Sequence, residues 1–392
     1  MKKLAPILLL LFFSCTVRKS SPGADPLQAH AEAVKASYAP DARTALFSVT
    51  ARNGVVAGET NIPEAKEALL RRLREAGQTF IDSITVLPHP ALKGRHFAVV
   101  NLSVANLRTL PRHPAELSTQ AMLGTPLKVW KFERGWYLVQ TPDQYLAWMD
   151  GGGLELMDST SFYKWHQKRK IVYTQPFGFA YTAAARDSAT VSDLVYGDVL
   201  EFKREQSGFY EVGFPDGRTA FVPATDAAPY RDWATSRQPT EENLVSTARR
   251  LMGLPYLWGG TSVKGVDCSG FTKTIYFMNG LVLPRDASQQ VTIGEEIDTK
   301  NGWQNLRPGD LLFFGAPARE GRPERVVHVG MWIGNGEFIH SAGRVQVGSL
   351  IPGTANYDES EHKRFLRAKR IDSTTAIHDL RKNLIYETNG VW

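Results

Sequence analysis

The sequence predicts a multidomain protein in which two copies of a small all-β domain precede an α+β domain. A pattern of glycine, aromatic, valine and proline residues between positions 124 and 148 returns between positions 197 and 221 at a constant offset of 73 residues, which indicates a duplicated domain. Further along, helical spacing of apolar residues over 240–280 gives way to strand-like segments over 311–371. Helices followed by antiparallel strands are typical of an α+β domain.

The composition is that of a folded protein. The 392 residues are 43% hydrophobic and 10% aromatic, which is enough to build cores and excludes a disordered chain. The formal net charge is +6, but lysines and arginines are scattered without a long basic block. The sequence therefore gives no indication of nucleic-acid binding.

The N-terminus has the layout of an export signal. Lys2 and Lys3 precede an apolar run from Leu4 to Phe13, which is too short to span a bilayer as a stable helix. We therefore predict a signal peptide over residues 1–14.

Cys15 directly follows this apolar run. The run ends in LFFSC, which resembles the lipobox of bacterial lipoproteins, except that Phe12 occupies the position where Leu is usual. The resemblance implies that Cys15 becomes lipid-modified and anchors an exported protein to a membrane in the periplasm. The alternative is an ordinary signal peptide cut nearby. With Cys15 lipidated, Cys268 would be the one remaining thiol, without an intramolecular disulfide partner.

Two segments lie between the signal and the repeat. Residues 15–42 are rich in Ser, Pro, Ala and charge with little periodicity, so we predict a tether. Residues 43–104 predict an α/β lead segment, in which Pro63 and Glu64 open a helix. Its expected elements are a strand over 43–49, a helix that Gly77 ends, and strands over 80–87 and 96–104.

The repeat predicts one small β domain over residues 105–165 and a second over 166–232. Each copy reads as short strands separated by turn residues. The order of features (apolar strand, Gly-aromatic-x-x-Val, Pro-Asp turn, aromatic strand) resembles that of bacterial SH3-like barrels, and it implies a fold more than a ligand. The pairs that keep the offset are Gly124/Gly197, Trp136/Phe209, Val139/Val212, Pro142/Pro215 and Trp148/Phe221.

The α+β domain is predicted over residues 238–372, followed by a C-terminal tail over 373–392. Glu241 and Glu242 open its first helix and Gly253 ends it. A second helix starts near Cys268 and ends at Gly280. Strands are expected over 311–314, 326–333 and 337–341, the last two joined by the turn residues Gly334-Asn335-Gly336.

Cys268 lies at or near the first turn of its helix. Unpaired backbone N–H groups and the helix dipole there favour an anion. We therefore expect the pKa of the thiol to lie below the value of about 8.5 for a free cysteine, which would make the thiolate available as a nucleophile. The alternative is a buried structural cysteine.

Two histidines can serve this thiol as base and orienting group. His328 and His340 lie in apolar strands of a hairpin centred on Gly334. If the two residue numbers of each cross-strand pair add up to an even number, both imidazoles project from the same face of the hairpin. If they add up to an odd number, the imidazoles project from opposite faces. With Cys268 over that face, the three would form a triad in which His328 is the base. A zinc site is the alternative, although HExxH or CxxC spacing and a fourth ligand are missing.

The residues around this triad resemble those of the NlpC-type cell-wall cysteine peptidases over residues 240–371. The resemblance implies a papain-like α+β fold and cleavage of bacterial stem peptides without metal or cofactor. It makes Cys268 the nucleophile, His328 the base and His340 the third member. Tyr256, if it does not merely pack, would help the Cys268 N–H to hold the oxyanion. The matching motifs are PYLWGG at 255–260, DCSGF at 267–271, LPR at 283–285, SQQ at 288–290, PGDL at 308–311 and HVG at 328–330.

The whole architecture resembles the γ-D-glutamyl-L-diamino-acid endopeptidases of cell-wall peptide recycling. The resemblance implies that Asp267, Ser269 and Ser288 bind the D-Glu part of the substrate. Glu116 would hold the free amino group of L-Ala, unless it is only a solvated surface acid. Tyr145 would assist Glu116.

These features predict an enzyme that hydrolyses the bond between γ-D-Glu and the diamino acid in free murein stem peptides with an N-terminal L-Ala. The third residue of the stem peptide, diaminopimelate or Lys, stays open. One alternative is a hydrolase of intact peptidoglycan that uses the SH3-like domains to bind the wall. Another is a non-catalytic surface lipoprotein that binds the wall or a peptide.

Overall fold

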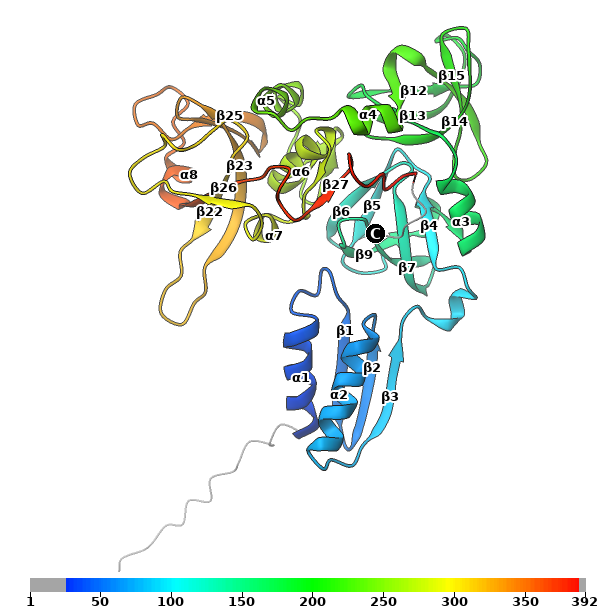
Figure 1. The fold of residues 1–392 in the computed structure, drawn as a ribbon, viewed down its shortest axis with the longest axis vertical. Helices are drawn as coiled ribbons and strands as arrows, with labels where there is room; N and C mark the ends of the chain where they lie inside the picture. The colour runs from blue at the N-terminus through cyan, green and yellow to red at the C-terminus, as the bar shows by residue number, and fades with distance from the viewer. Residues whose placement is uncertain (1–25, 388–392) are drawn as a thin grey trace, which may run out of the picture.

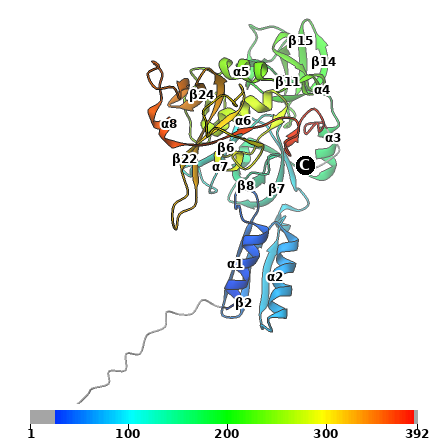
Figure 2. The same cartoon turned by 60° about the vertical axis from the view of Figure 1, so that its left-hand side comes forward.

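The structure is a computed structural model that describes residues 26–387. The predicted signal peptide and Cys15 lie outside the described residues. Figures 1 and 2 show a lead segment that projects away from three further domains, which lie side by side. No helix within residues 26–387 is long and apolar enough to cross a membrane.

The lead segment is a three-stranded sheet covered by two helices. A hairpin joins β1 to β2, and α2 connects β2 to the parallel strand β3. Pro63 opens α2 as the sequence predicts, and Ala65, Leu69 and Leu73 are its buried face. The elements are α1 (Pro26–Tyr38), β1 (Phe47–Arg52), β2 (Val55–Thr60), α2 (Pro63–Glu75) and β3 (Ile81–Val86).

Helix α1 lies inside the range 15–42 that the sequence analysis assigns to a tether. Its buried residues are Leu27, Ala31 and Val34, which form one apolar stripe at helical spacing. They pack in one core with residues of α2 and the sheet. This part of the range is therefore a packed helix, because three apolar side chains on one face suffice to dock a short helix.

The first β domain is a seven-stranded sheet with the order β10-β4-β7-β8-β9-β5-β6. Short 3-10 turns at Pro90–Leu92 and Gly151–Gly153 precede its first and last strands. The strands are β4 (Phe97–Val100), β5 (Val104–Arg108), β6 (Leu117–Met122), β7 (Pro126–Glu133), β8 (Trp136–Gln140), β9 (Leu146–Asp150) and β10 (Leu154–Met157), and α3 (Ser159–His166) follows.

The second β domain has the equivalent order β17-β11-β14-β15-β16-β12-β13. A 3-10 turn at Ala224–Asp226 precedes its last strand. The strands are β11 (Lys170–Tyr173), β12 (Phe177–Tyr181), β13 (Thr190–Val195), β14 (Val199–Gln206), β15 (Phe209–Gly213), β16 (Thr219–Pro223) and β17 (Ala227–Pro229), and α4 (Tyr230–Ser236) follows.

The duplication extends well beyond the stretch visible in the sequence. All seven strands of the second β domain begin 73 residues after their counterparts, from β4 and β11 to β10 and β17. Turn conformations repeat at the same offset: Gly124 and Gly197 both have a positive φ, 82° and 96°, which glycine adopts readily. Gln144 and Gly217 share the same property. The two copies therefore have one topology.

Strand β4 corrects the boundary between the lead segment and the first β domain. It lies within 43–104, the range assigned to the lead segment, but it pairs with β7 and β10. Ala98, Val99 and Val100 are fully buried there. An apolar strand pattern alone does not reveal which sheet the strand joins, because its partners are distant in the sequence.

The third domain is built around α6, which packs on an antiparallel sheet of order β21-β26-β22-β23-β24-β25. Phe271 and Ile275 of α6 share a core with Val329, Met331 and Ile339 of the sheet. Its helices are α5 (Glu241–Arg250), α6 (Cys268–Met278), α7 (Ala287–Gln290) and α8 (Glu359–Arg364). The sheet strands are β21 (Glu295–Ile297), β22 (Leu311–Ala316), β23 (Arg325–Gly334), β24 (Glu337–Ala342), β25 (Arg344–Ser349) and β26 (Phe365–Arg370).

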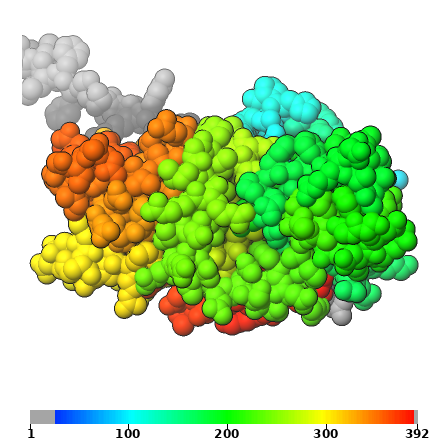
Figure 3. All heavy atoms as spheres, turned by 90° about the horizontal axis from the view of Figure 1, so that it is seen from above, coloured from blue at the N-terminus to red at the C-terminus, as the bar shows by residue number. Residues whose placement is uncertain are grey.

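Two small strand pairs complete the third domain. The pair β18 (Thr261–Ser262) and β19 (Gly265–Val266) precedes α6. The pair β20 (Leu281–Val282) and β27 (His378–Asp379) brings part of the predicted tail, 373–392, against the domain. Leu384, Ile385 and Tyr386 are buried there. Figure 3 shows this segment in red along the edge where the second β domain meets the third.

Candidate active site

Cys268 is the first residue of α6. Asp267 caps the helix by accepting a hydrogen bond from the Gly270 N–H at 2.7 Å, as N-cap aspartates do. The preceding loop lies directly against the helix start, since a Cβ at position 270 would stand 2.0 Å from the Gly260 carbonyl oxygen. The glycines of the motif therefore fix the thiol at the helix start.

The histidine pair satisfies the register condition. Met331 pairs with Ile339 and Trp332 with Phe338, so the paired numbers sum to an even number. His328 and His340 accordingly lie together, with Nε2 of His328 3.0 Å from Nδ1 of His340. Both imidazoles are buried.

Cys268 and the histidine pair have different packing neighbours, and the expectation that Cys268 lies over their face stays a prediction. The core beneath α6 is built by Val329, Met331 and Ile339, whereas the two histidine rings contact Phe314 and Phe338. The thiol approaches the backbone of Val329, the residue after His328. Within residues 26–387 no hydrogen bond joins the Cys268 thiol to His328.

The thiol does not ionise easily at its buried position, which contradicts the expectation from its place at a helix start. Burial raises the pKa of Cys268 to about 12, and the charge of Asp267 acts in the same direction. Backbone N–H groups of Val329 and Ser269 oppose these effects and are outweighed. Burial also lowers the pKa of His328 to about 3 and that of His340 to about 4. Thiol and imidazoles are therefore neutral at neutral pH.

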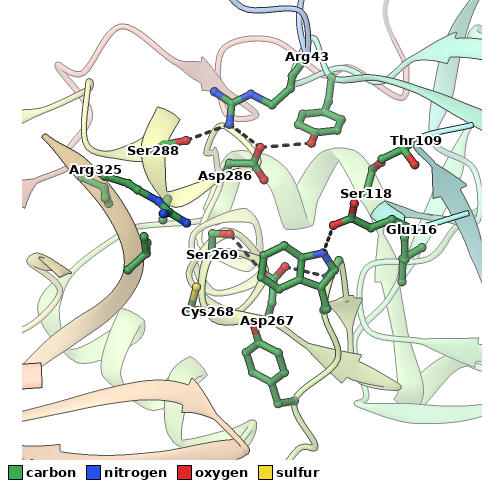
Figure 4. A pocket seen from close by; sticks show the side chains of 18 residues that line it. Arg43, Thr109, Glu116, Ser118, Asp267, Cys268, Ser269, Asp286, Ser288 and Arg325 are labelled. Atoms are coloured by element: carbon green, nitrogen blue, oxygen red, sulfur yellow. Dashed lines mark hydrogen bonds and ion pairs between the residues drawn. The ribbon is translucent and has the colours of Figure 1, made fainter. Parts of the chain in front are cut away.

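A cavity of about 410 Å³ opens above the thiol, between the lead segment, the first β domain and the third domain (Figure 4). Seven of the nine predicted catalytic and substrate-binding residues line it, whereas His328 and His340 are not among its lining residues. The seven are Glu116, Tyr145, Tyr256, Asp267, Cys268, Ser269 and Ser288.

Glu116 stands at the rim of the cavity, on the side of the first β domain. Its carboxylate accepts a hydrogen bond from Nε1 of the exposed Trp258 at 2.7 Å. Glu116 is itself exposed. One oxygen of this carboxylate is therefore open to a ligand in the cavity.

Tyr145 contacts a different acid from the predicted one. Its hydroxyl donates to Asp286 at 3.2 Å, and no hydrogen bond links it to Glu116 among the described residues. The carboxylate of Asp286 also accepts a hydrogen bond from Nη1 of Arg43 at 2.8 Å, and the same nitrogen donates a hydrogen bond to the hydroxyl of Ser288 at 2.9 Å. Arg43 belongs to the lead segment, where Asp41 holds its other nitrogens.

Asp267 has little capacity left for a substrate. Its carboxylate accepts hydrogen bonds from the N–H groups of Gly259 and Gly270. It also pairs with the fully buried Arg285, whose Nη2 lies 2.7 Å away. The hydroxyl of Ser269 is held between Asp267 and Arg285. An ion pair with Arg285 thus engages Asp267 and fixes Ser269, and the contact of Asp267 with D-Glu stays a prediction.

Four charged or aromatic residues of the cavity were not predicted from the sequence. Trp258 and Asp286 lie inside or next to motifs that the sequence analysis singles out, so their positions carried a signal. Arg43 and Arg325 are far from any motif and reach the cavity only through the fold. Among the described residues, no group of three His, Cys, Asp or Glu side chains is placed to hold a metal ion.

Two family descriptions match the chain. The NlpC/P60 family matches residues 253–367, and the bacterial dipeptidyl-peptidase SH3 domain matches residues 107–154. A γ-D-glutamyl-L-lysine dipeptidyl-peptidase of Bacillus cereus is 32% identical over 257 residues, which are 62% of this chain and 73% of the relative. The enzyme of the same name from Bacillus subtilis is 30% identical over 233 residues, covering 57% and 72%.

The fold is similar to that of a solved relative. The crystal structure of an NlpC/P60 family protein from Bacillus cereus aligns with a TM-score of 0.58 at 27% identity. The alignment covers 70% of this chain and 99% of that one.

Proposed function

Because the chain belongs to the NlpC/P60 family of cysteine peptidases, with an SH3-like domain before the catalytic one, we propose that it cleaves the bond after γ-D-Glu in free cell-wall stem peptides. The substrate would begin with L-Ala, and the diamino acid that follows D-Glu would leave. One observation carries the proposal: Glu116 of the first β domain shares the cavity with Cys268.

The proposed reaction begins on a neutral pair. Nε2 of His328 and Nδ1 of His340 share a hydrogen bond. In the proposed tautomer His328 is its donor, which leaves Nδ1 of His328 to accept the thiol proton. A hydrogen bond between base and nucleophile often tightens only when substrate is bound. As the sulfur attacks the γ-carbonyl carbon, the proton passes to His328 and then to the leaving amine. The acyl-enzyme on Cys268 is hydrolysed by water, which restores the thiol.

Tyr256 is proposed to stabilise the developing oxyanion together with the Cys268 N–H. That N–H belongs to the first turn of α6, where backbone donors have no partner within the helix. Burial raises the pKa of Tyr256 to about 12, with Cys268 and Asp267 acting in the same direction. The phenol therefore keeps its proton at neutral pH and can donate a hydrogen bond.

Glu116 is proposed to select the substrate by its free amino group. A carboxylate at the rim binds the ammonium of L-Ala, whereas a stem peptide still joined to glycan has no ammonium there. Ser269 and Ser288 are proposed to hold the D-Glu part. Asp267 would act indirectly, by positioning Ser269, and Tyr145 by holding Asp286 beside Arg43.

The remaining sequence predictions are proposals as well. We propose export through a signal peptide over residues 1–14 and a lipid anchor on Cys15 in the periplasm. We also propose SH3-like barrels for the two β domains and a papain-like α+β fold for the third. The domain limits are those of the sequence analysis, with α1 added to the lead segment and β4 moved to the first β domain.

Mass spectrometry of a tripeptide digest tests the proposal. L-Ala-γ-D-Glu-diamino acid should yield L-Ala-γ-D-Glu and the free diamino acid, and Cys268→Ala should yield neither. Iodoacetamide should block the reaction by alkylating the Cys268 thiolate that forms when the proton passes to His328. Failure of the intact protein to cleave the tripeptide would contradict the proposal.

A further inference from the structure

Arg325 is a cation in the cleft that has no partner among the described residues. It is the exposed first residue of β23 and lines the cavity with Cys268. Within residues 26–387 its guanidinium makes no hydrogen bond or ion pair. Figure 4 shows it pointing into the pocket from the wall opposite Glu116, with Ser269 between the two.

A β-bulge turns Arg325 toward the histidine. On the ladder between β22 and β23, Phe314 pairs with His328, but Ala316 pairs with Arg325. Val327 is therefore an extra residue on β23, and bulges of this kind re-aim side chains next to active sites. Because Phe314 and Ala316 share one face of β22, their partners His328 and Arg325 also share a face.

The neighbouring charges leave Arg325 free. Glu324, the adjacent acid, is held by Nη2 of Arg367 at 2.5 Å. The other cation that lines the cavity, Arg43, is already paired with Asp41 and Asp286. An anion that enters the cleft on the side of β23 would therefore meet one uncompensated positive charge.

The part of the substrate beside Arg325 follows from the proposed function, on which this step rests. His328 must reach the leaving amine, so the leaving amino acid lies against β23. We propose that Arg325 is a specificity residue that binds a carboxylate of this leaving amino acid. Two carboxylates qualify: the α-carboxylate at a free C-terminus, and the distal carboxylate of a diaminopimelate-type side chain, which lysine lacks.

Four tripeptides separate the two sources. L-Ala-γ-D-Glu is joined either to lysine or to diaminopimelate, and each is made with a free α-carboxylate and with an α-carboxamide. The intact protein is compared with Arg325→Gln, Arg325→Lys and the control Arg322→Gln. The control removes an equal charge from the exposed hairpin outside the cavity. Circular dichroism checks that each variant folds.

We expect Arg325→Gln to lower kcat/KM about tenfold or more for peptides that carry the recognised carboxylate, in line with a hydrogen bond to a charged group. The loss should be smaller for peptides without that carboxylate, and Arg325→Lys should restore part of it. A fall in kcat/KM of Arg325→Gln with both diaminopimelate peptides identifies the distal carboxylate as the group that Arg325 binds. Loss with both free-acid peptides identifies the α-carboxylate.

Two results would overturn the assignment. If the unmodified protein cleaves the peptides but Arg325→Gln lowers kcat/KM equally for all four, or for none, Arg325 does not bind a carboxylate of the substrate. The proposed function then stands. If the unmodified protein cleaves none of them, the proposed function fails and the role of Arg325 fails with it.

Discussion

The two β domains share one strand order and one spacing, but they meet the third domain in different ways. The first makes polar contacts beside the cleft, where Thr119 binds Arg285 and Gln120 binds Thr261. The second makes aromatic contacts away from the cleft through α4, the helix that follows it, where Trp233 packs on Phe277. Of the two, only the first contributes residues to the cavity. After duplication, one copy lines the cavity and the other packs against the third domain away from it.

The second β domain also fixes the C-terminal segment. The ring of Tyr230 packs against Tyr386, with centroids 5.2 Å apart, and Glu387 accepts a hydrogen bond from the Lys170 N–H. His166, the last residue of α3, contacts the Ile385 carbonyl. The C-terminal segment thus joins the second β domain to the end of α6.

The largest expected effect concerns how the first β domain docks. Asp143 forms a largely buried ion pair with Lys273 of α6 at 2.7 Å. Asp143→Ala leaves the lysine without its partner and should lower the free energy of unfolding by about 3–5 kcal/mol. At the matched position of the second copy, Asp216 pairs with Arg218 near the surface, so Asp216→Ala should cost at most about 1 kcal/mol.

Denaturant unfolding of both variants measures this difference. The double variant Asp143→Ala/Lys273→Met should recover much of the lost stability, because it removes the buried charge. A double variant as unstable as Asp143→Ala would show that the buried pair is not the cause.

The second copy, unlike the first, should contribute a pH dependence to the free energy of unfolding through Lys170. Burial lowers the pKa of Lys170 to about 7, whereas its counterpart in the first copy is the apolar Phe97. Between pH 7 and about 10.5 the unfolded chain binds more protons at this lysine than the folded one. Stability should therefore rise with pH in that window, by at most about 1.4 kcal/mol per pH unit.

Lys170→Met tests this contribution. The variant should flatten the dependence of the unfolding free energy on pH above 7 without altering which peptides are cleaved. An unchanged slope would assign the pH dependence to other groups.

Glu116→Gln should weaken selection for a free amine. The amide keeps the acceptor for Trp258 but loses the charge that attracts an ammonium, so kcat/KM for the free-amine tripeptide should fall about tenfold. Ala189→Gln places the same side chain at the exposed matched position of the second copy and should have no effect. Equal activity of Glu116→Gln and the unmodified protein would remove the proposed role of the first copy.

Tyr145→Phe should have the smallest effect. It removes one hydrogen bond to Asp286 while Arg43 continues to hold that acid, so kcat/KM should fall about three- to fivefold, as expected for a single net hydrogen bond. Tyr210→Phe in the second β domain is the control and should leave kcat/KM unchanged. A loss of a hundredfold or more would mean that the tyrosine contacts the substrate directly.

Local patterns in the sequence were sufficient to predict a cysteine at a helix start, the contact between the two histidines and the duplication. His328 and His340 both have even numbers, so they share a face of the hairpin when the numbers of each cross-strand pair add up to an even number. The glycines around Cys268 mark a helix start. These features depend on neighbours in the chain or on one hairpin, so a single sequence contains them.

The features that escaped prediction depend on contacts between distant segments. Arg43 reaches Asp286 across 243 positions, and the re-aiming of Arg325 depends on one bulged residue, Val327. The thiol pKa depends on burial by the whole fold, which outweighs the helix start. Helix α1 was missed because its apolar stripe is short and its partners lie in α2 and the sheet.

The most direct test of the account compares one tripeptide with its N-acetylated form. If the first β domain selects substrates through Glu116, the intact protein should cleave free L-Ala-γ-D-Glu-diamino acid with a kcat/KM at least about tenfold higher than that of the acetylated peptide. Equal rates on the two peptides would contradict the account and would favour an enzyme that acts on intact peptidoglycan.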